Sequence, residues 1–250
     1  PNFTNTFTMQ VYSGTLELQG MTTNEEAFVR ERLIYLKQIA QRAPPEVLAK
    51  LIAGFPLLFV KPQLSLSSLY WTESKEPENA YVLQWFLSKE FFYNSGNDPE
   101  QLILLARMPF FIFGILLGVY IFLWSLELYG ETAGLFALFL YILSPNILAY
   151  VSIAITDFVL TTFFFIAVYY FWRWRREKTT KMLVCCGFFS GLANATKLTG
   201  LYLIPIFLFF ICLDFIKGKN KKLVEVFLAL LILFVISFSI IAASYFFVNL

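Results

Sequence analysis

Residues 101–126 read QLILLARMPFFIFGILLGVYIFLWSL, an apolar stretch with a single charged side chain, that of Arg107. A transmembrane helix needs about 20 consecutive, mostly apolar residues, so this stretch is long enough to cross a bilayer. The whole chain has the same character, because 58% of its 250 residues are hydrophobic and only 14% are charged. Soluble domains are roughly half apolar and about a quarter charged. The composition therefore predicts a membrane protein.

Further apolar segments follow the first one, and together they predict an all-α, polytopic protein with about six transmembrane helices. The predicted segments are 101–126, 133–151, 154–172, 182–196, 200–216 and 223–248. All except the fourth have nearly the length that a span requires. Asp98, Pro99 and Glu100 mark the start of the first helix, because they offer an N-cap, a first-turn proline and a first-turn acid.

The N-terminal part of the chain has a mixed, net acidic composition, and it predicts a separate region. We divide the chain into an extracytoplasmic region, 1–101, and a transmembrane region, 102–250. The amphipathic segment 25–40 and the segment 78–93, in which aromatic residues alternate with charges, predict helices that lie in the membrane interface. The apolar run 46–60 is too short to cross a bilayer and predicts another interfacial helix.

Basic residues set the predicted topology. Lysine and arginine cluster in 173–181 and in 217–222, and such loops face the cytoplasm. Two predicted segments separate the two loops, so both can lie on one side. The turn 196–200, the loop 144–153 and all of 1–101 then lie outside. We expect a multi-pass protein of the plasma (inner) membrane.

The chain lacks residues that several functions require. It has no histidine, so this segment cannot form His-based catalytic dyads or triads or zinc sites with His ligands. Its net charge is only +2, so we expect no nucleic-acid partner. The sequence predicts no metal site and no cofactor, with a divalent cation left open. The cysteines Cys185, Cys186 and Cys212 lie in apolar runs and are predicted to be small buried hydrophobic residues.

The two ends of the chain predict a fragment. The chain begins with Pro1 rather than Met, shows no signal peptide, and ends at Leu250 directly after an apolar run. We therefore expect a piece of a longer protein, with functional parts outside it.

Five ionisable residues are candidates for a functional site, because the predicted topology places them at the outer side of the membrane. They are Glu25, Glu26, Arg107, Asp157 and Lys197. Ionisable residues near membrane depth are costly and commonly functional. Arg107 and Lys197 could contact a phosphate, since arginine and lysine are common phosphate donors.

Each candidate also has a purely structural interpretation. Lys197 could extend its ammonium group to the interface, and Arg107 could form an internal ion pair. Asp157 could cap the helix that it precedes. Glu25 and Glu26 could do no more than favour the first turn of a helix, where acids belong.

Short motifs in the transmembrane region resemble one group of membrane enzymes. The motifs are LARMP (105–109), YGETAG (129–134), the stretch from Ala137 to Ser144-Pro145-Asn146, Thr156-Asp157 and GLANATK (191–197). In this order, over about 95–216, the sequence resembles the dolichyl-phosphate-mannose–protein mannosyltransferases. It also resembles their bacterial relatives, which include the aminoarabinose transferase of lipid A and other GT-C glycosyltransferases.

The resemblance implies that the protein transfers a sugar from a polyprenyl-phosphate donor to a protein or lipid acceptor at the extracytoplasmic face. In the family an acidic pair in the first outer loop supplies the catalytic base, and Glu25 with Glu26 is the nearest match. Arg107 and Lys197 would then hold the donor phosphate. Asp157 would orient the acceptor or assist the base.

Two other functions stay open at this point. A lipid transporter or flippase could use the same outer cations to bind a headgroup without cleaving it. Transporters usually show repeated halves and broken helices, and neither is evident in the sequence. A non-catalytic GT-C relative is the other alternative, because Ala43 stands before Pro44 and Pro45 where the family has a histidine.

Overall fold

The computed structural model describes residues 47–60, 62–63, 88–216 and 223–249. The candidates Glu25 and Glu26 and the predicted helix 25–40 lie outside these residues, as does most of the predicted helix 78–93. The chain forms two compact units, one of Pro1–Pro44 with Gly54–Ala106 and the other of Pro45–Ala53 with Arg107–Leu250.

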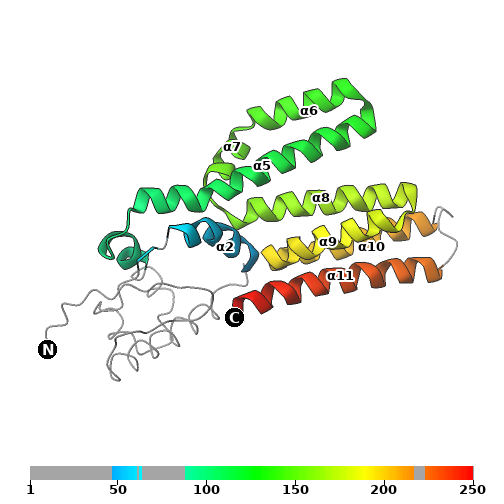
Figure 1. Cartoon of the computed structure of the whole chain (residues 1–250). Coiled ribbons are helices and arrows are strands. Elements are labelled where there is room, and N and C mark those ends of the chain that lie inside the picture. Colours follow the sequence, from blue (N-terminus) through cyan, green and yellow to red (C-terminus); the bar gives the residue numbers. More distant parts are fainter. Residues whose placement is uncertain (1–46, 61, 64–87, 217–222, 250) are drawn as a thin grey trace. The chain divides into compact units, whose positions relative to one another are not determined.

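Every regular element among the described residues is a helix, so the predicted all-α fold is confirmed for this part of the chain (Figure 1). The elements are α2 (Val47–Gly54), η1 (Phe55–Phe59), η3 (Glu90–Asn94), α5 (Pro99–Tyr129), α6 (Glu131–Leu143), α7 (Pro145–Ser152), α8 (Thr156–Glu177), α9 (Thr180–Thr196), η4 (Leu198–Tyr202), α10 (Leu203–Ile216) and α11 (Leu223–Asn249). The run 46–60 is thus helical over α2 and η1, and its place in the interface stays a prediction.

Helix α5 begins where the sequence predicts. The Asp98 carboxylate accepts hydrogen bonds from the backbone N–H groups of Glu100 at 3.0 Å and Gln101 at 3.3 Å, as an N-cap does. At 31 residues, α5 is long and apolar enough to cross a membrane, and so is the continuous stretch Leu198–Ile216. A third span results if the bent pair α6–α7 counts as one, and the predicted number of six stays a prediction.

The predicted segment 133–151 is not one straight helix. Ser144 has an extended backbone with ψ of 115°, and α6 and α7 meet there at 60°. The cause is Pro145, because a proline ring disfavours the helical conformation for the residue before it. A broken helix was not expected from the sequence, and the bend corrects that expectation.

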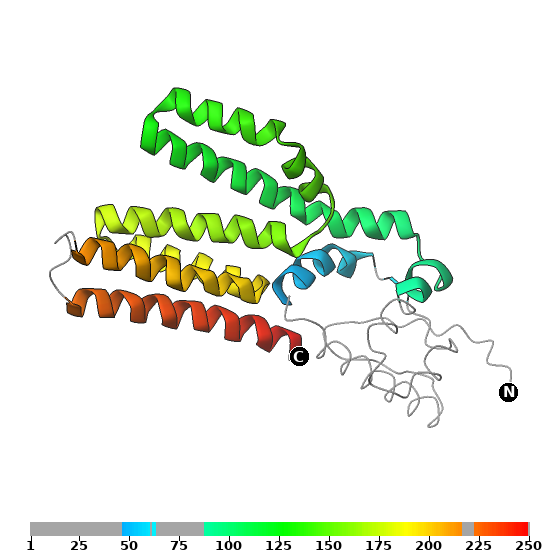
Figure 2. The ribbon, with the colours of Figure 1, turned by 180° about the vertical axis from the view of Figure 1, so that it is seen from behind.

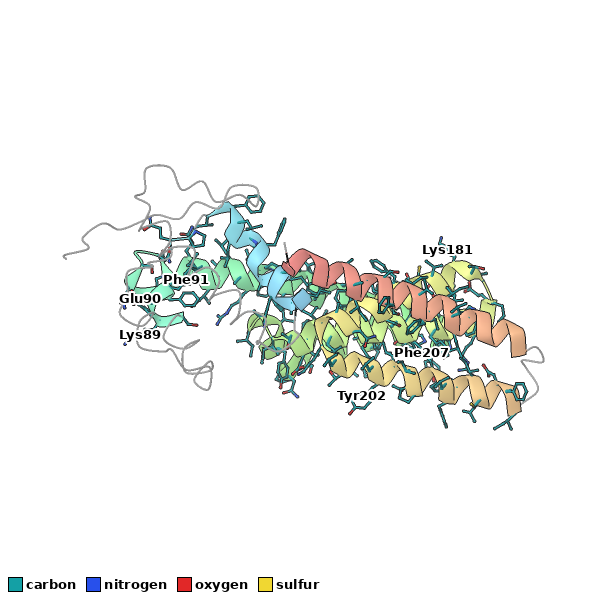
Figure 3. The ribbon with its side chains drawn as sticks, turned by 90° about the horizontal axis from the view of Figure 1, so that it is seen from below. Lys89, Glu90, Phe91, Lys181, Tyr202 and Phe207 are labelled. Carbon is teal, nitrogen blue, oxygen red and sulfur yellow. The ribbon has the colours of Figure 1, made fainter. Side chains whose placement is uncertain are left out.

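The other unit is built around the helices α8, α9 and α11, which lie side by side in both ribbon views, with α9 antiparallel to α8 and parallel to α11 (Figure 2). Phe171 of α8 stacks on Phe207 of α10 with ring centroids 4.1 Å apart. Figure 3 shows the two faces of this segment, with Phe207 directed among the helices and Tyr202 directed away from them. Cys186 is buried as predicted, whereas Cys212 is exposed, so its predicted burial is wrong.

Glycines on α9 allow α11 to approach closely. A Cβ atom added at Gly187 would lie 3.2 Å from Ile236, and one at Gly191 would lie 2.9 Å from Ile240. Two small residues four positions apart lie on one face of a helix, and such pairs are typical of close helix contacts in membranes. The packing of α9 on α11 therefore depends on these two positions having no side chain.

Large apolar side chains point outward from several helices, including Ile112 and Ile115 of α5 and Phe234 of α11. Water would penalise such a surface, whereas lipid does not. The exposed Cys212 lies on the same kind of surface, which explains why an apolar sequence run does not by itself predict burial in a membrane protein.

Charged residues at the C-terminal end of α8 are paired rather than simply exposed. The Arg175 guanidinium donates two hydrogen bonds of 2.6 Å to the Asp214 carboxylate of α10, whose side chain is only 7% exposed. Arg173 pairs with Glu177 at 2.8 Å. Glu127 of α5 accepts a hydrogen bond of 2.5 Å from the Tyr169 hydroxyl. These contacts tie α8 to α10 and α5.

The unit that contains Gly54–Ala106 has a polar clamp in its described part. The Asn97 side chain exchanges hydrogen bonds with the Gln63 backbone, at 2.8 Å to the N–H and 2.7 Å to the carbonyl. Asn97 also donates to the carbonyl of Phe91 at 2.6 Å. Its amide thereby fixes the segment that leads into α5.

Candidate functional site

The candidate site lies where α8 begins and α9 ends. Asp157 is the second residue of α8, and Lys197 directly follows α9. The helices are antiparallel neighbours, so residues 40 positions apart in the chain meet at one end. The sequence predicted both residues at the same side of the membrane, and the structure brings them into direct contact.

Asp157 and Lys197 form an ion pair. The Lys197 Nζ atom lies 2.6 Å from Oδ1 of Asp157, and the two side chains are 33% and 59% exposed, respectively. An ion pair this open to solvent contributes little to stability, typically less than about 1 kcal/mol. The charges therefore stay accessible to a ligand, and an anion such as phosphate could share the ammonium group with the carboxylate.

The backbone around Lys197 is held from both sides. Its N–H donates to the Ala193 carbonyl at 3.1 Å, and its own carbonyl accepts from the Gly200 N–H at 3.0 Å. A Cβ atom at Gly200 would lie 2.9 Å from the backbone of both Ala193 and Asn194. Only glycine fits there without a shift of the backbone, so Gly200 allows η4 to fold against the end of α9 and fixes the position of Lys197.

The capping interpretation of Asp157 is wrong. Ile155 occupies the N-cap position of α8, and no side chain caps this helix. Asp157 lies inside the first turn, where the positive end of the helix dipole favours its charge, and its carboxylate turns to Lys197 instead. Its backbone carbonyl accepts a hydrogen bond of 2.7 Å from the Thr161 hydroxyl.

The remaining candidates do not join this pair in the described structure. Arg107 lies on α5 with an exposed side chain, and it forms no ion pair with any residue that the structure describes. An internal ion pair of Arg107 with a residue outside the described ranges stays a prediction. The positions of Glu25 and Glu26 fall outside the described ranges, so their role stays a prediction.

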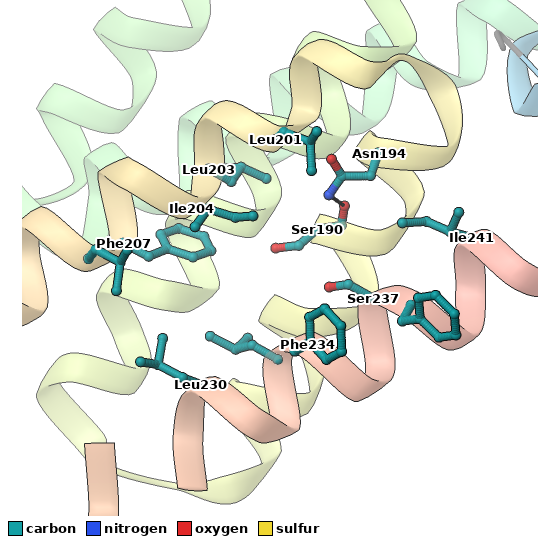
Figure 4. A pocket seen from close by; sticks show the side chains of 13 residues that line it. Ser190, Asn194, Leu201, Leu203, Ile204, Phe207, Leu230, Phe234, Ser237 and Ile241 are labelled. Atoms are coloured by element: carbon teal, nitrogen blue, oxygen red, sulfur yellow. Dashed lines mark hydrogen bonds between the residues drawn. The ribbon is translucent and has the colours of Figure 1, made fainter. Parts of the chain in front are cut away.

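The structure also contains a cavity that was not predicted from the sequence. The cavity has a volume of about 330 Å³ and lies between α9, the η4–α10 segment and α11 (Figure 4). Its walls are apolar except for Ser190 and Asn194 of α9 and Ser237 of α11. A signal was present in the sequence, because Gly187, Ser190, Gly191 and Asn194 recur at helical spacing and form one small, polar face.

No metal site is evident in the part of the chain that the structure describes, since no three His, Cys, Asp or Glu side chains gather there. The chemistry that the described site offers is one cation and one carboxylate side by side. Such a pair can bind a phosphate and place a carboxylate near a hydroxyl group.

Comparison with known proteins assigns most of the chain to one family. Residues 79–241 match the family described as dolichyl-phosphate-mannose-protein mannosyltransferase. The chain has no significant match among curated proteins or among solved structures. The match covers more than half of the chain and includes Arg107, Asp157 and Lys197. The chain therefore belongs to the dolichyl-phosphate-mannose-protein mannosyltransferase family, and with its long apolar helices it is an integral membrane protein of the GT-C glycosyltransferase type.

Proposed function

We propose that the protein transfers a sugar from a polyprenyl-phosphate donor to a hydroxyl group of a protein or lipid acceptor, at the extracytoplasmic face. The observation that carries the proposal is the Asp157–Lys197 ion pair of 2.6 Å, in a chain of a glycosyltransferase family. An exposed cation next to a carboxylate is what a phosphate-linked sugar and an incoming hydroxyl group require.

In the proposed reaction the acceptor oxygen attacks the anomeric carbon of the sugar. The bond from that carbon to the phosphate oxygen breaks, and the polyprenyl phosphate leaves with the bonding electrons. The hydroxyl proton passes to a carboxylate, which acts as general base. We assign that base to Glu25 or Glu26, by the family resemblance.

Lys197 in this proposal binds the donor phosphate and stabilises the charge that develops on it. Arg107 supplies a second cation. Asp157 holds the Lys197 ammonium in place before the donor arrives, and it then orients the acceptor hydroxyl or assists the base. Its place in the first turn of α8 puts the carboxylate at the positive end of the helix dipole.

The other end of α8 supports the proposed topology. The Arg176 guanidinium lies over the Trp172 ring at 4.8 Å, and the Lys178 ammonium lies over the Trp174 ring at 4.8 Å. Aromatic residues with cations next to them are typical of a membrane interface, and the excess of cations suits the cytoplasmic one. We propose that this end lies in the cytoplasm, and that Asp157 lies outside in a multi-pass protein of the plasma membrane with six spans.

The test uses the intact protein in liposomes, with dolichyl-phosphate mannose as the donor. We expect Lys197→Ala to weaken donor binding about ten- to hundredfold, since hydrogen bonds to charged groups contribute about 1.5–3 kcal/mol. We expect Asp157→Asn to lower turnover about a hundredfold with less change in donor binding. Lys181→Ala is the matched control, because Lys181 is an exposed lysine that points away from the helices (Figure 3). Unchanged donor affinity in Lys197→Ala would contradict the proposed site.

A transporter is the second candidate, and the 60° bend between α6 and α7 favours it, since broken helices are common in transporters. The same liposomes separate the functions. Movement of the lipid across the bilayer without cleavage of the sugar–phosphate bond would establish a transporter. Donor binding with neither cleavage nor movement would identify a non-catalytic relative, in line with Ala43 in place of the family histidine.

A further inference from the structure

The cavity between α9, α10 and α11 has the size and the walls of a ligand site. Its volume of about 330 Å³ is at the lower end of the range for small-molecule pockets, roughly 300–1,000 Å³. Phe207 and Leu230 line one part of it, and Leu201 and Ile241 line another (Figure 4). Among the described residues that line it, none is charged. The walls therefore suit a single aliphatic chain and disfavour an ionic headgroup.

Two buried oxygen atoms at this cavity, Oγ of Ser190 and Oδ1 of Asn194, have no nitrogen or oxygen atom as a hydrogen-bond partner in the described structure. The Asn194 amide nitrogen donates to the Ser190 carbonyl at 2.8 Å, and a carbonyl can only accept. The amide orientation is therefore fixed, and its oxygen is left to accept a hydrogen bond. Ser190 is only 5% exposed, and its hydroxyl makes a side-chain hydrogen bond to the Cys186 thiol, which is a weak partner that a ligand hydroxyl group can replace.

The hydrogen-bonding capacity of these two atoms indicates which functional group a ligand would have to place next to them. Asn194 Oδ1 requires a donor, while the Ser190 hydroxyl can donate or accept. Ser237 faces them from α11, and its hydroxyl donates to the Gly187 carbonyl at 3.0 Å, so it too has only acceptor capacity left. One hydroxyl group on a ligand meets these needs, because its proton can go to Asn194 while its oxygen accepts from Ser190. Unsatisfied polar atoms are costly inside a membrane, so such a group would bind selectively.

We propose that this cavity binds a neutral, single-chain lipid alcohol, with its hydroxyl group at Ser190 and Asn194 and its aliphatic chain along α10 and α11. A phosphate is unsuited to this place because no cation lines the cavity. A plain hydrocarbon fills the apolar part but leaves both oxygen atoms unsatisfied. The site is separate from the Asp157–Lys197 pair, and its ligand does not have to take part in sugar transfer.

The test is photo-crosslinking of the intact protein in lipid nanodiscs with a long-chain alcohol that carries a diazirine. We expect labelled peptides from Leu201–Phe207 and from 230–238. Unlabelled 1-dodecanol should compete at about tenfold lower concentration than dodecane, since one or two hydrogen bonds of ordinary strength correspond to about that factor. Equal competition by the two compounds would overturn the proposal, because it would show that the cavity binds an aliphatic chain without recognising a hydroxyl group. Absence of label from these peptides would overturn it as well.

Variants distinguish the contribution of the hydroxyl contact to ligand binding from the contribution of the apolar walls. Ser190→Ala with Asn194→Leu should abolish the preference for the alcohol and leave dodecane competition unchanged. Asn146→Leu on α7 is the control, because Asn146 is exposed and does not line the cavity. Leu230→Phe fills the cavity and should reduce labelling by both probes, which keeps the test decisive if the double variant does not fold. Sugar transfer measured on the same samples is independent of this outcome, so failure here leaves the proposed function standing.

Discussion

Helix α8 has an ion pair at each end, and the two pairs differ in burial and geometry. At its start, Lys197 makes one contact of 2.6 Å with the Asp157 carboxylate, which is 59% exposed. At its end, Arg175 makes two contacts of 2.6 Å with Asp214, which is 7% exposed. The two pairs join α8 to the chain that follows it, but only the first is open to a ligand. An accessible, weakly stabilising pair is suited to binding, whereas a buried, bidentate pair fixes the structure.

The largest expected effect is on stability, at the buried pair. Asp214→Ala leaves the Arg175 guanidinium largely buried without its carboxylate, and breaking a buried pair in this way costs about 3–5 kcal/mol. Thermal unfolding of the protein in detergent measures the loss. A change below about 1 kcal/mol would show that the two ends of α8 do not differ in the way we describe.

A double replacement at the same pair sharpens the comparison. Arg175→Met with Asp214→Leu removes both charges together, and apolar groups of similar size can replace a buried ion pair at little cost. We expect this variant to recover most of the stability that Asp214→Ala loses. The matching replacement at the other end, Lys197→Met with Asp157→Leu, should instead abolish sugar transfer while the protein stays folded. Loss of folding in the second variant would contradict a binding role for that pair.

Single substitutions at the exposed pair should change stability only slightly. We expect Asp157→Asn and Lys197→Ala to lower the free energy of unfolding by less than about 1 kcal/mol each, because exposed ion pairs rarely contribute more. The same unfolding assay tests this, with Lys181→Ala as the control. A loss near that of Asp214→Ala would mean that the exposed pair is a structural contact.

The smallest effect concerns salt. At 1 M salt the Debye length is about 3 Å, against about 10 Å at 0.1 M, so exposed charges are screened and buried ones much less. A double-mutant cycle over Asp157 and Lys197 should give a coupling energy that falls by more than about half between these concentrations. The corresponding cycle over Arg175 and Asp214 should change little. Equal salt dependence of the two coupling energies would contradict their different burial.

The convergence of Asp157 and Lys197 could be anticipated from the sequence, because antiparallel helices of about equal length return the chain to the side where it began. Their direct contact could not be predicted, since it depends on how far α9 extends before Gly200 turns the chain. The cap at Asp98 was predictable for a different reason, because it involves neighbouring residues only.

Other features depend on contacts between distant segments, and these escaped sequence reasoning. The cavity exists because Gly187 and Gly191 admit α11 on one side of α9 while η4 and α10 bound it on another, and no local pattern gives that spacing. The bend at Pro145 had a local signal, the proline itself, but the proline does not specify the angle of 60°. The exposure of Cys212 follows from lipid as the solvent, which reverses the usual rule for apolar residues.

The lack of space for a side chain at Gly200 predicts the phenotype of mutations at this position. The position of the Lys197 ammonium depends on a main-chain turn that has no room for a Cβ atom at residue 200. Missense alleles at that codon should therefore share the phenotype of Lys197 alleles, even though they leave every charged side chain intact. Suppressors of a Gly200→Ala allele should be found among substitutions that shorten or loosen the end of α9, and a Lys197→Ala allele should have none of that kind.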